Sequence, residues 1–420
     1  MAITVIIASS AGMAWADTYE AHLQPSKFTL YSDPYNGNRI KVGGSSGLYP
    51  VAGKHDRYYV VTDRGPAPDF KDANGLNYKT FATPDFGPHI LTVRLLPSGK
   101  AMIEDMKPLR RPDGVVITGL PTTLPATDKP YDFNLQPLPY DEDSIDAEGI
   151  TIDPWGNFWV CEEYKPSVAM VAPDGTVLMR LVPAGTRTGS EVVPTHELLP
   201  GILAKRRNNR GFEGIAVTTG GILYAIVQRP LNNPNRAAAD ANGNARLVAV
   251  DLNVLLHGAT GTLVKQYLYQ MPAGNSSVTA SDLFATGPTT LLVPERNTDT
   301  LFEIDVAGAT DLTPLENASG RLISDPSKTL EQLNPAGLAA LEVVPVSKSV
   351  VIASLTAIDP LLEKVEGVCV VGDSIVLTYD NDFNVSDTAS IPSNPDPEGP
   401  LVQLELVGAN YPKFFTLPRP

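Results

Sequence analysis

Five stretches of this chain share one pattern, and the pattern restricts the fold to a repeated β-hairpin. Each stretch opens with a polar residue, followed in four cases by glycine and then by an apolar residue: Ser46-Gly47-Leu48, Glu148-Gly149-Ile150, Glu213-Gly214-Ile215, Ser281-Asp282-Leu283 and Glu366-Gly367-Val368. A second apolar stretch then ends in a polar pair: Asp63-Arg64, Glu162-Glu163, Gln228-Arg229, Glu295-Arg296 and Asp380-Asn381. An antiparallel hairpin brings the start of its first strand beside the end of its second. We therefore expect the polar residues of all five repeats on one rim of the fold.

Two further strands are predicted after several of these hairpins. The clearest pairs are 89–95 with 101–105, 169–172 with 177–181, and 246–252 with 263–269. A hairpin and a following pair make a four-stranded blade, and repeated blades are typical of a β-propeller. The sequence thus predicts an all-β fold, a single β-propeller of five or six four-stranded blades.

Three parts of this prediction stay open. Residues 341–355 could form a sixth blade or outer strands of a neighbouring one, and residues 27–31 or 402–407 are expected to close the ring. Short helices are expected only at 194–205 and 359–364. The 38 proline and 34 glycine residues argue against long helices.

The first 16 residues differ from the rest of the chain. They are small and apolar, and Ala14-Trp15-Ala16 has the form of a signal-peptidase site that would leave Asp17 as the first residue. A buried first strand is the alternative interpretation. We expect a signal peptide at 1–16, a single propeller domain at 17–420, and a periplasmic or secreted location.

Charge and hydropathy limit the partners of the protein. The formal net charge is −15, which disfavours nucleic acid and anionic membrane surfaces as partners. No internal stretch approaches the roughly 18 apolar residues that a membrane span requires. The sequence does not indicate the oligomeric state.

Carboxylates dominate the predicted rim. Seven of them occupy repeat positions: Asp63, Glu148, Glu162, Glu213, Glu295, Glu366 and Asp380. Carboxylates gathered in one place repel each other, so protons or a cation must compensate the charge. Oxygen ligands suit Ca²⁺ best, although another divalent or trivalent metal is possible. We expect Glu148, Glu213, Glu366, Asp380 and Glu295 as metal ligands; alternatively, each carboxylate bonds the backbone of the next blade.

Arginines accompany the carboxylates. Arg64, Arg229 and Arg296 share one repeat position, and Arg210 lies three residues before Glu213. The guanidinium fork matches phosphate or carboxylate in two-point contact, so these residues are candidates for binding an anion. The alternative is that they pair with neighbouring carboxylates and hold the blades together.

Four stretches together resemble the bacterial phytase-like family named for the esterase-like activity of phytase. They are Tyr59 to Pro66, Asp146 to Ile150, Asn209 to Gly214, and Lys364 to Gly367 leading to Asp380-Asn381-Asp382-Phe383. The resemblance implies a propeller, export, and a phosphoester or ester hydrolase. The fourth repeat, Ser281-Asp282-Leu283, departs from the Glu-Gly pattern.

These observations predict an exported, metal-dependent hydrolase that acts on a small anionic phosphoester. Asp63 or Glu162 would take the proton of the attacking water. Arg64, Arg210, Arg229 or Arg296 would orient the phosphate. Hydrolysis of a carboxylic ester or lactone is an alternative, and so is a non-catalytic periplasmic protein that binds a metal or an anion.

Overall fold

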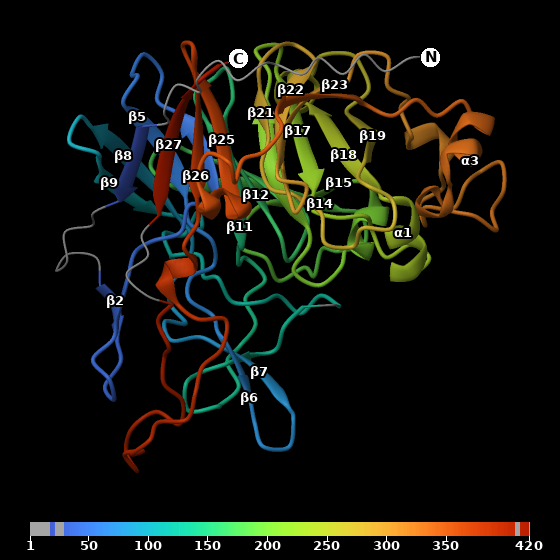
Figure 1. Cartoon of the computed structure of the whole chain (residues 1–420). Helices are drawn as coiled ribbons and strands as arrows, with labels where there is room; N and C mark the ends of the chain where they lie inside the picture. Colours follow the sequence, from blue (N-terminus) through green and yellow to red (C-terminus); the bar gives the residue numbers. More distant parts are fainter. Residues whose placement is uncertain (1–16, 22–28, 126, 408–411, 420) are drawn as a thin grey trace.

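The computed structural model describes residues 17–21, 29–125, 127–407 and 412–419, and most of the regular secondary structure in these residues is β-strand. The expected signal peptide at 1–16 lies outside them. Each sequence repeat forms the predicted antiparallel hairpin (Figure 1). The hairpins are β4–β5 (Gly47–Pro50, Arg57–Val61), β11–β12 (Ala147–Ile152, Phe158–Glu162), β16–β17 (Phe212–Val217, Ile222–Val227), β21–β22 (Phe284–Ala285, Thr290–Arg296) with β20 (Thr279–Ala280), and β25–β26 (Val365–Val371, Ser374–Tyr379).

Outer strands extend each hairpin into a sheet of at least four strands. They are β8 and β9 (His89–Leu96, Lys100–Pro108), β13 to β15 (Ser167–Val171, Val177–Pro183, Thr195–Leu199), β18 and β19 (Asn244–Asp251, Val264–Gln270), β23 and β24 (Thr300–Asp305, Ser347–Ile352), and β27 with β1 (Lys413–Pro418, Asp17–Ala21). The three strand pairs expected from the sequence are therefore confirmed. The stretch 341–355 supplies β24, an outer strand of the fourth sheet.

The first strands of the hairpins lie side by side at the centre of the molecule. β4 contacts β11, β11 contacts β16, β16 contacts β21, β21 contacts β25, and β25 contacts β4. Glycine permits the close approach, since a Cβ on Gly47 would lie 2.7 Å from Cα of Gly149 and one on Gly214 would lie 2.4 Å from the carbonyl carbon of Asp282. Apolar side chains fill the space between adjacent sheets, as Val61 and Ile150 do in one buried cluster.

β1 joins the last sheet to the first. It pairs antiparallel with β27 and parallel with β9, so the first and fifth sheets form one eight-stranded sheet. The expectation that 27–31 or 402–407 would close the ring is wrong. Residues 29–32 instead form β2 (Thr29–Ser32), which pairs with β3 (Arg39–Lys41), and residues 402–407 lie outside the large sheets.

A smaller body, which we call the lower lobe, projects beneath the sheets in Figure 1. It combines β2, β3, β6 (Asp69–Lys71), β7 (Asn77–Thr80), β10 (Pro130–Tyr131) and the segment 382–407. These pieces share a buried apolar cluster of their own, which includes Ile40, Phe70, Phe133, Val402 and Leu404. The sequence pattern does not predict this lobe.

Helices are few and short. The described residues contain α1 (Arg236–Asn242), α2 (Leu252–His257), α3 (Pro335–Ala340) and 3₁₀ turns at Gly201–Lys205, Thr313–Leu315, Leu330–Gln332, Pro360–Lys364 and Asp382–Asn384. The helix expected at 359–364 is a 3₁₀ turn, whereas 194–205 divides into strand β15 and a 3₁₀ turn. Within the described ranges, no helix has both the length and the apolar character to cross a membrane.

Candidate active site

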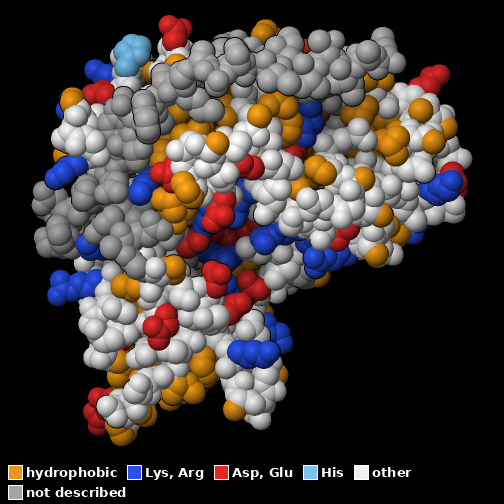
Figure 2. Space-filling view, viewed as in Figure 1, with side chains coloured by type: hydrophobic (Ala, Val, Ile, Leu, Met, Phe, Trp, Pro, Cys, Tyr) orange, Lys and Arg blue, Asp and Glu red, His pale blue; other side chains and the backbone are white. Residues whose placement is uncertain are grey.

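A cavity of about 600 Å³ lies at the rim where the polar ends of the five hairpins meet. Residues of all five hairpins line it, and the lower lobe adds Asp69 and Lys79 from β6 and β7. Ten carboxylates and six cationic side chains form part of the lining. Figure 2 shows these acidic and basic groups gathered in the hollow between the sheets and the lower lobe.

β-Bulges direct three of the predicted glutamates into the cavity. Ala147 pairs with Glu162 and Gly149 pairs with Cys161, so Glu148 is an extra residue on its strand. Glu213 and Glu366 occupy the same extra position in β16 and β25. A bulge re-aims a side chain that regular pleating would point elsewhere. The Glu-Gly pair of the sequence pattern therefore marks a bulge that presents a carboxylate at the rim.

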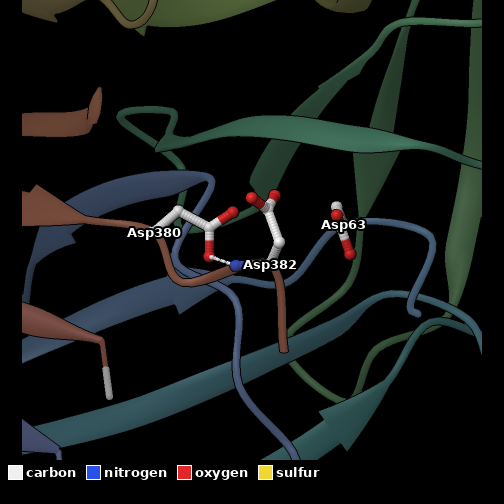
Figure 3. Close-up of side chains that lie close together, drawn as sticks. All are labelled: Asp63, Asp380 and Asp382. Atoms are coloured by element: carbon white, nitrogen blue, oxygen red, sulfur yellow. Dashed lines mark hydrogen bonds between the residues drawn. The ribbon is translucent and has the colours of Figure 1, made fainter. Parts of the chain in front are cut away.

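One carboxylate group, the Asp63 cluster, consists of Asp63, Asp380 and Asp382 (Figure 3). One oxygen from each lies within 4.8 Å of the others. Backbone N–H groups of Ser45 and Asp382 donate to Oδ1 of Asp380 at 3.0 and 3.2 Å, which fixes that carboxylate. Lys364 forms ion pairs with Asp380 and Asp382, so this cluster is partly neutralised.

A second group, the Glu148 cluster, consists of Asp146, Glu148 and Glu163, again with oxygens within 4.8 Å of one another. Nη1 of Arg64 donates to Oδ2 of Asp146 at 2.7 Å, and Nη1 of Arg210 lies 3.3 Å from Oε1 of Glu163. The side chain of Glu148 takes part in none of the hydrogen bonds or ion pairs found among the described residues. It is the carboxylate of this cluster that remains free to bind a ligand.

Burial and mutual repulsion raise the pKa values of the cavity carboxylates. Burial, then Glu213 and Asp146, hold the pKa of Glu148 well above its usual range. Burial and the charges of Asp380 and Asp146 do the same to Asp63. Burial raises the pKa of Glu163 to about 7, although Arg210 opposes the shift. The protein's own cations thus leave part of the negative charge uncompensated.

Glu213 lies between other carboxylates and is only half satisfied. Gln228 donates a hydrogen bond to Oε1, but the buried Oε2 has no partner in the described structure. Burial, followed by Glu163 and Glu366, raises its pKa well above the usual range. Glu366 itself pairs with Arg296. A buried carboxylate oxygen without a partner costs free energy, which a cation or a proton in the cavity would offset.

The four predicted arginines all line the cavity but have different partners. Arg64, Arg210 and Arg296 pair with Asp146, Glu163 and Glu366, which is the alternative role considered above. Arg229 forms no such ion pair in the described residues, and its Nη2 donates to the backbone oxygen of Ser277 at 2.8 Å. Arg229 is therefore the arginine best able to accept an external anion.

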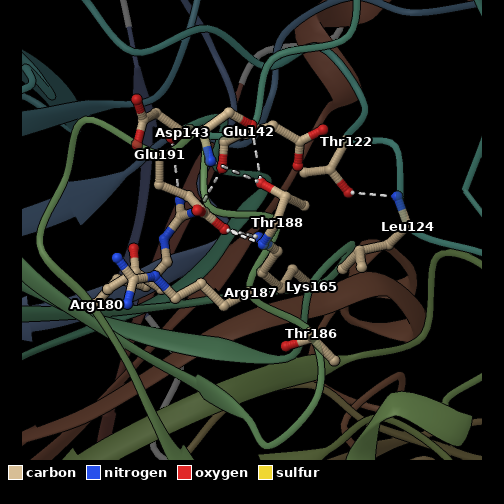
Figure 4. A network of polar contacts seen from close by, with 12 residues as sticks. Thr122, Leu124, Glu142, Asp143, Lys165, Arg180, Thr186, Arg187, Thr188 and Glu191 are labelled. Carbon is tan, nitrogen blue, oxygen red and sulfur yellow. Dashed lines mark hydrogen bonds and ion pairs between the residues drawn. The ribbon is translucent and has the colours of Figure 1, made fainter.

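Two of the predicted site residues do not reach the cavity. Both oxygens of Glu162 accept the backbone N–H of Lys165, and Ser167 donates to Oε1 at 3.2 Å. Successive strand residues point to opposite faces, so Glu163 enters the cavity while Glu162 turns away. Lys165 in turn pairs with Glu191 at 3.4 Å within a buried polar network that includes Arg180 (Figure 4).

Glu295 is the second such residue. It is fully buried, accepts the hydroxyl of Tyr269 at 2.6 Å and pairs with Lys348. These contacts hold β19, β22 and β24 together. No carboxylate of the fourth repeat faces the cavity in the described structure, because Asp282 accepts the backbone N–H of Val368 at 2.8 Å and links β25 to its neighbour.

The sequence reasoning missed several lining residues. Glu163 directly follows the predicted Glu162, and Asp146 lies two residues before the predicted Glu148. Lys364 precedes the fifth repeat in the same way. No sequence pattern indicates Lys79, because it reaches the cavity from the lower lobe, where Asp69 pairs with it at 3.2 Å.

The residues present fit a hard cation. Both clusters offer only carboxylate oxygens, and ligands that share Ca²⁺ at 2.3–2.6 Å lie at most about 5 Å apart. The separations within the two clusters fall inside that limit. The free carboxylate of Glu148 and the unpartnered oxygen of Glu213 supply charge and lone pairs that the protein does not satisfy.

Fold and site together define an all-β protein with an acidic cavity built from repeated hairpins. Residues 40–383 match the family described as "Phytase-like: Esterase-like activity of phytase", and the chain belongs to this family. A curated relative, an "Uncharacterized secreted protein" of Arthroderma benhamiae, is 30% identical. That match covers 30% of this chain and 27% of the relative, so it spans only about a quarter of the relative's length.

The solved structures that resemble this chain include proteins described by other activities. A periplasmic gluconolactonase of Pseudomonas aeruginosa is 12% identical with a TM-score of 0.33, over 97% of this chain and 100% of that one. An aldose sugar dehydrogenase of Streptomyces coelicolor, bound to PQQ, is 10% identical with a TM-score of 0.32, over 96% and 99%. TM-scores this low support no conclusion about activity.

Proposed function

We propose that this protein is an exported, metal-dependent hydrolase of phosphoesters whose reaction centre is the acidic cavity. The observation that carries the proposal is the pair of carboxylate clusters, buried and incompletely neutralised, in a cavity that also holds arginines. The description of the family supports an ester bond as the target. The bulged glutamates support a built site, because three repeats use the same device to present a carboxylate.

The fold that we propose is a five-bladed β-propeller. The first strands of the five hairpins contact one another in the order of the sequence, and β25 returns to β4. The stretch 341–355, once a candidate for a sixth blade, is part of the fourth sheet. Such a ring would place the bulges of Glu148, Glu213 and Glu366 around one axis.

Export is also a proposal. The predicted cleavage site ends at Ala16, and strand β1 begins at Asp17. Removal of the leader at that site would leave β1 intact to pair with β27 and β9. The relative described as secreted supports the same location.

The residues would share the chemistry as follows. Asp380 and Asp382 of the Asp63 cluster, and the Glu148 cluster with Glu213, would hold Ca²⁺ or a similar cation. Such a cation would polarise the phosphoryl group and stabilise the negative charge that develops on it. Arg229 would orient the phosphate through its guanidinium. Asp63, whose pKa is raised by burial, would accept a proton from the attacking water, since Glu162 does not reach the cavity.

The test measures turnover of p-nitrophenyl phosphate and p-nitrophenyl acetate, each with EDTA and with Ca²⁺. We expect phosphoester turnover that EDTA abolishes and Ca²⁺ restores. Glu148→Gln should lose both metal affinity and turnover, whereas the matched control Glu398→Gln, an exposed residue of the lower lobe, should keep both. Turnover of the acetate alone would favour the esterase or lactonase alternative. Metal binding without turnover of either substrate would favour a binding protein.

A further inference from the structure

A second hollow opens beside the acidic cavity, and its charge is of the opposite sign. We call it the basic chamber; its volume is about 550 Å³. Its lining contains the six cationic residues Arg64, Lys79, Arg207, Arg210, Arg229 and Arg236. Asp69 and Asp128 are the two acidic residues among those that line it. The chamber shares Arg64, Arg210 and Arg229 with the cavity, so the two spaces adjoin.

Arg207 is the buried anchor of this chamber. Its Nε donates to the backbone oxygen of Pro230 at 3.2 Å, and its Nη2 pairs with Asp240 at 2.5 Å. These contacts fix the plane of the guanidinium. The residue is only 7% exposed, yet its Nη1 has no partner among the described residues. A buried N–H donor that is left unpaired is costly unless a ligand satisfies it.

Arg229, which also lines the chamber, shows a similar arrangement. Its Nη2 is held by the backbone oxygen of Ser277, whereas its buried Nε has no partner in the described structure. Burial, and then the like charges of Arg210 and Arg207, lower its pKa to about 10. Two fixed guanidinium groups with unused donors, in a mainly cationic surrounding, make a site for negative charge.

We propose that the basic chamber binds an oxyanion such as a phosphate, sulfate or carboxylate group, independently of any metal at the carboxylate clusters. Guanidinium groups bind all three chemical groups through paired hydrogen bonds. The oxyanion is either free in solution or a second charged group of the substrate. The latter source rests on the proposed function, because it requires an ester at the adjoining cavity.

The first experiment titrates inorganic phosphate by calorimetry into the full-length protein, which has been stripped of metal with EDTA and then dialysed free of the chelator, with sodium chloride at equal ionic strength as reference. We expect saturable binding of phosphate at one site. Arg207→Gln should weaken it about tenfold, the usual effect of losing a hydrogen bond to a charged group. Arg236→Gln, at the exposed start of α1, cannot disturb the core and should weaken binding about threefold.

Arg187→Gln is the matched control, because it removes the same charge from an exposed residue that does not line the chamber. Its phosphate affinity should equal that of the wild type. The proposal is overturned if phosphate binds no better than chloride, or if Arg187→Gln weakens binding as much as Arg236→Gln. Should Arg207→Gln fail to fold, the comparison of the two exposed variants decides.

The second experiment separates the two sources of the oxyanion. It compares KM for esters that carry one or two anionic groups, in the wild type and in Arg236→Gln. A KM increase of about threefold confined to the doubly charged ester identifies the substrate as the source. Equal KM values in both proteins, with phosphate binding intact, identify a free anion. Absence of all turnover refutes the proposed hydrolase but leaves the phosphate titration as the test of the chamber.

Discussion

The same substitution should affect different properties of the protein at two adjacent glutamates. Glu162 and Glu163 are equally buried, and burial raises the pKa of each to about 7. Glu162, however, accepts hydrogen bonds from the backbone N–H of Lys165 and the hydroxyl of Ser167, while Glu163 belongs to the Glu148 cluster. We predict that Glu162→Gln changes the stability of the protein with little effect on metal binding, and that Glu163→Gln lowers metal affinity.

The size of the stability effect follows from the pKa of Glu162. Its carboxyl titrates near 4.5 when unfolded and at about 7 when folded, so the folded state holds more protons between these values. The free energy of unfolding therefore falls as pH rises from 4.5 to 7. The difference between the two pKa values corresponds to a loss of about 3 kcal/mol in the free energy of unfolding. Glutamine cannot ionise, so Glu162→Gln removes this part of the pH dependence.

The assay is the melting temperature in EDTA at pH 5 and pH 8. For a domain of this length, about 3 kcal/mol corresponds to a shift of roughly 4 °C. Between pH 5 and pH 8, the melting temperature of the wild type should fall by about 4 °C more than that of Glu162→Gln. Calcium titrations at pH 8 should give the same affinity for Glu162→Gln as for the wild type, and an affinity at least about tenfold lower for Glu163→Gln.

Two results would refute this reasoning. If Glu162→Gln melts lower than the wild type by the same amount at both pH values, then Glu162 does not hold a proton in the folded state. If a folded Glu162→Gln variant loses calcium binding, the carboxylate acts at the cavity and the assignment of the two glutamates must be exchanged.

Three further outcomes are expected. Calcium at a hundred times its dissociation constant should stabilise the protein by about 2.7 kcal/mol, visible as a higher melting temperature than in EDTA; coincident curves would argue against a bound ion. Glu295→Gln should destabilise the protein by about 3 kcal/mol, because it leaves the partly buried Lys348 without its ion-pair partner. Calorimetry should find the calcium affinity unchanged. Gly211→Ala should lower calcium affinity, because its Cβ would lie 2.2 Å from the carbonyl oxygen of Glu163 and would displace that residue. Normal affinity in a folded variant would show that the position of the Glu163 backbone does not affect metal binding.

The hairpins and their shared rim could be predicted from the sequence because the signals are local. Glu148, Glu213 and Glu366 precede a glycine and an apolar strand, and all three line the cavity in the structure. Spacing between the two strands of a hairpin fixes which ends meet. Nine of the eleven residues expected at the site line the cavity for this reason.

What the sequence could not provide depends on register and on distant pairing. Side chains alternate between the two faces of a strand, so a register shift of one residue would decide whether Glu162 or Glu163 enters the cavity. The lower lobe is assembled from separate segments, so no continuous sequence pattern predicts it. Lys79 belongs to this lobe and was therefore not predicted either. The closing strands β1 and β27 also pair across almost the whole chain, a distance at which local patterns carry no information.

The pairing of β1 with β27 has a consequence for the timing of folding. The eight-stranded sheet needs residues 17–21 and 413–418 at once, so it cannot be completed until the ribosome has made almost the entire chain. The first strand must wait unpaired on one side while its partner is still being synthesised. Contacts between such distant segments form slowly because a long loop must close first. If the chain is exported as proposed, a nascent chain held open in this way would stay accessible to the export machinery, and β1 would pair with β27 only after delivery.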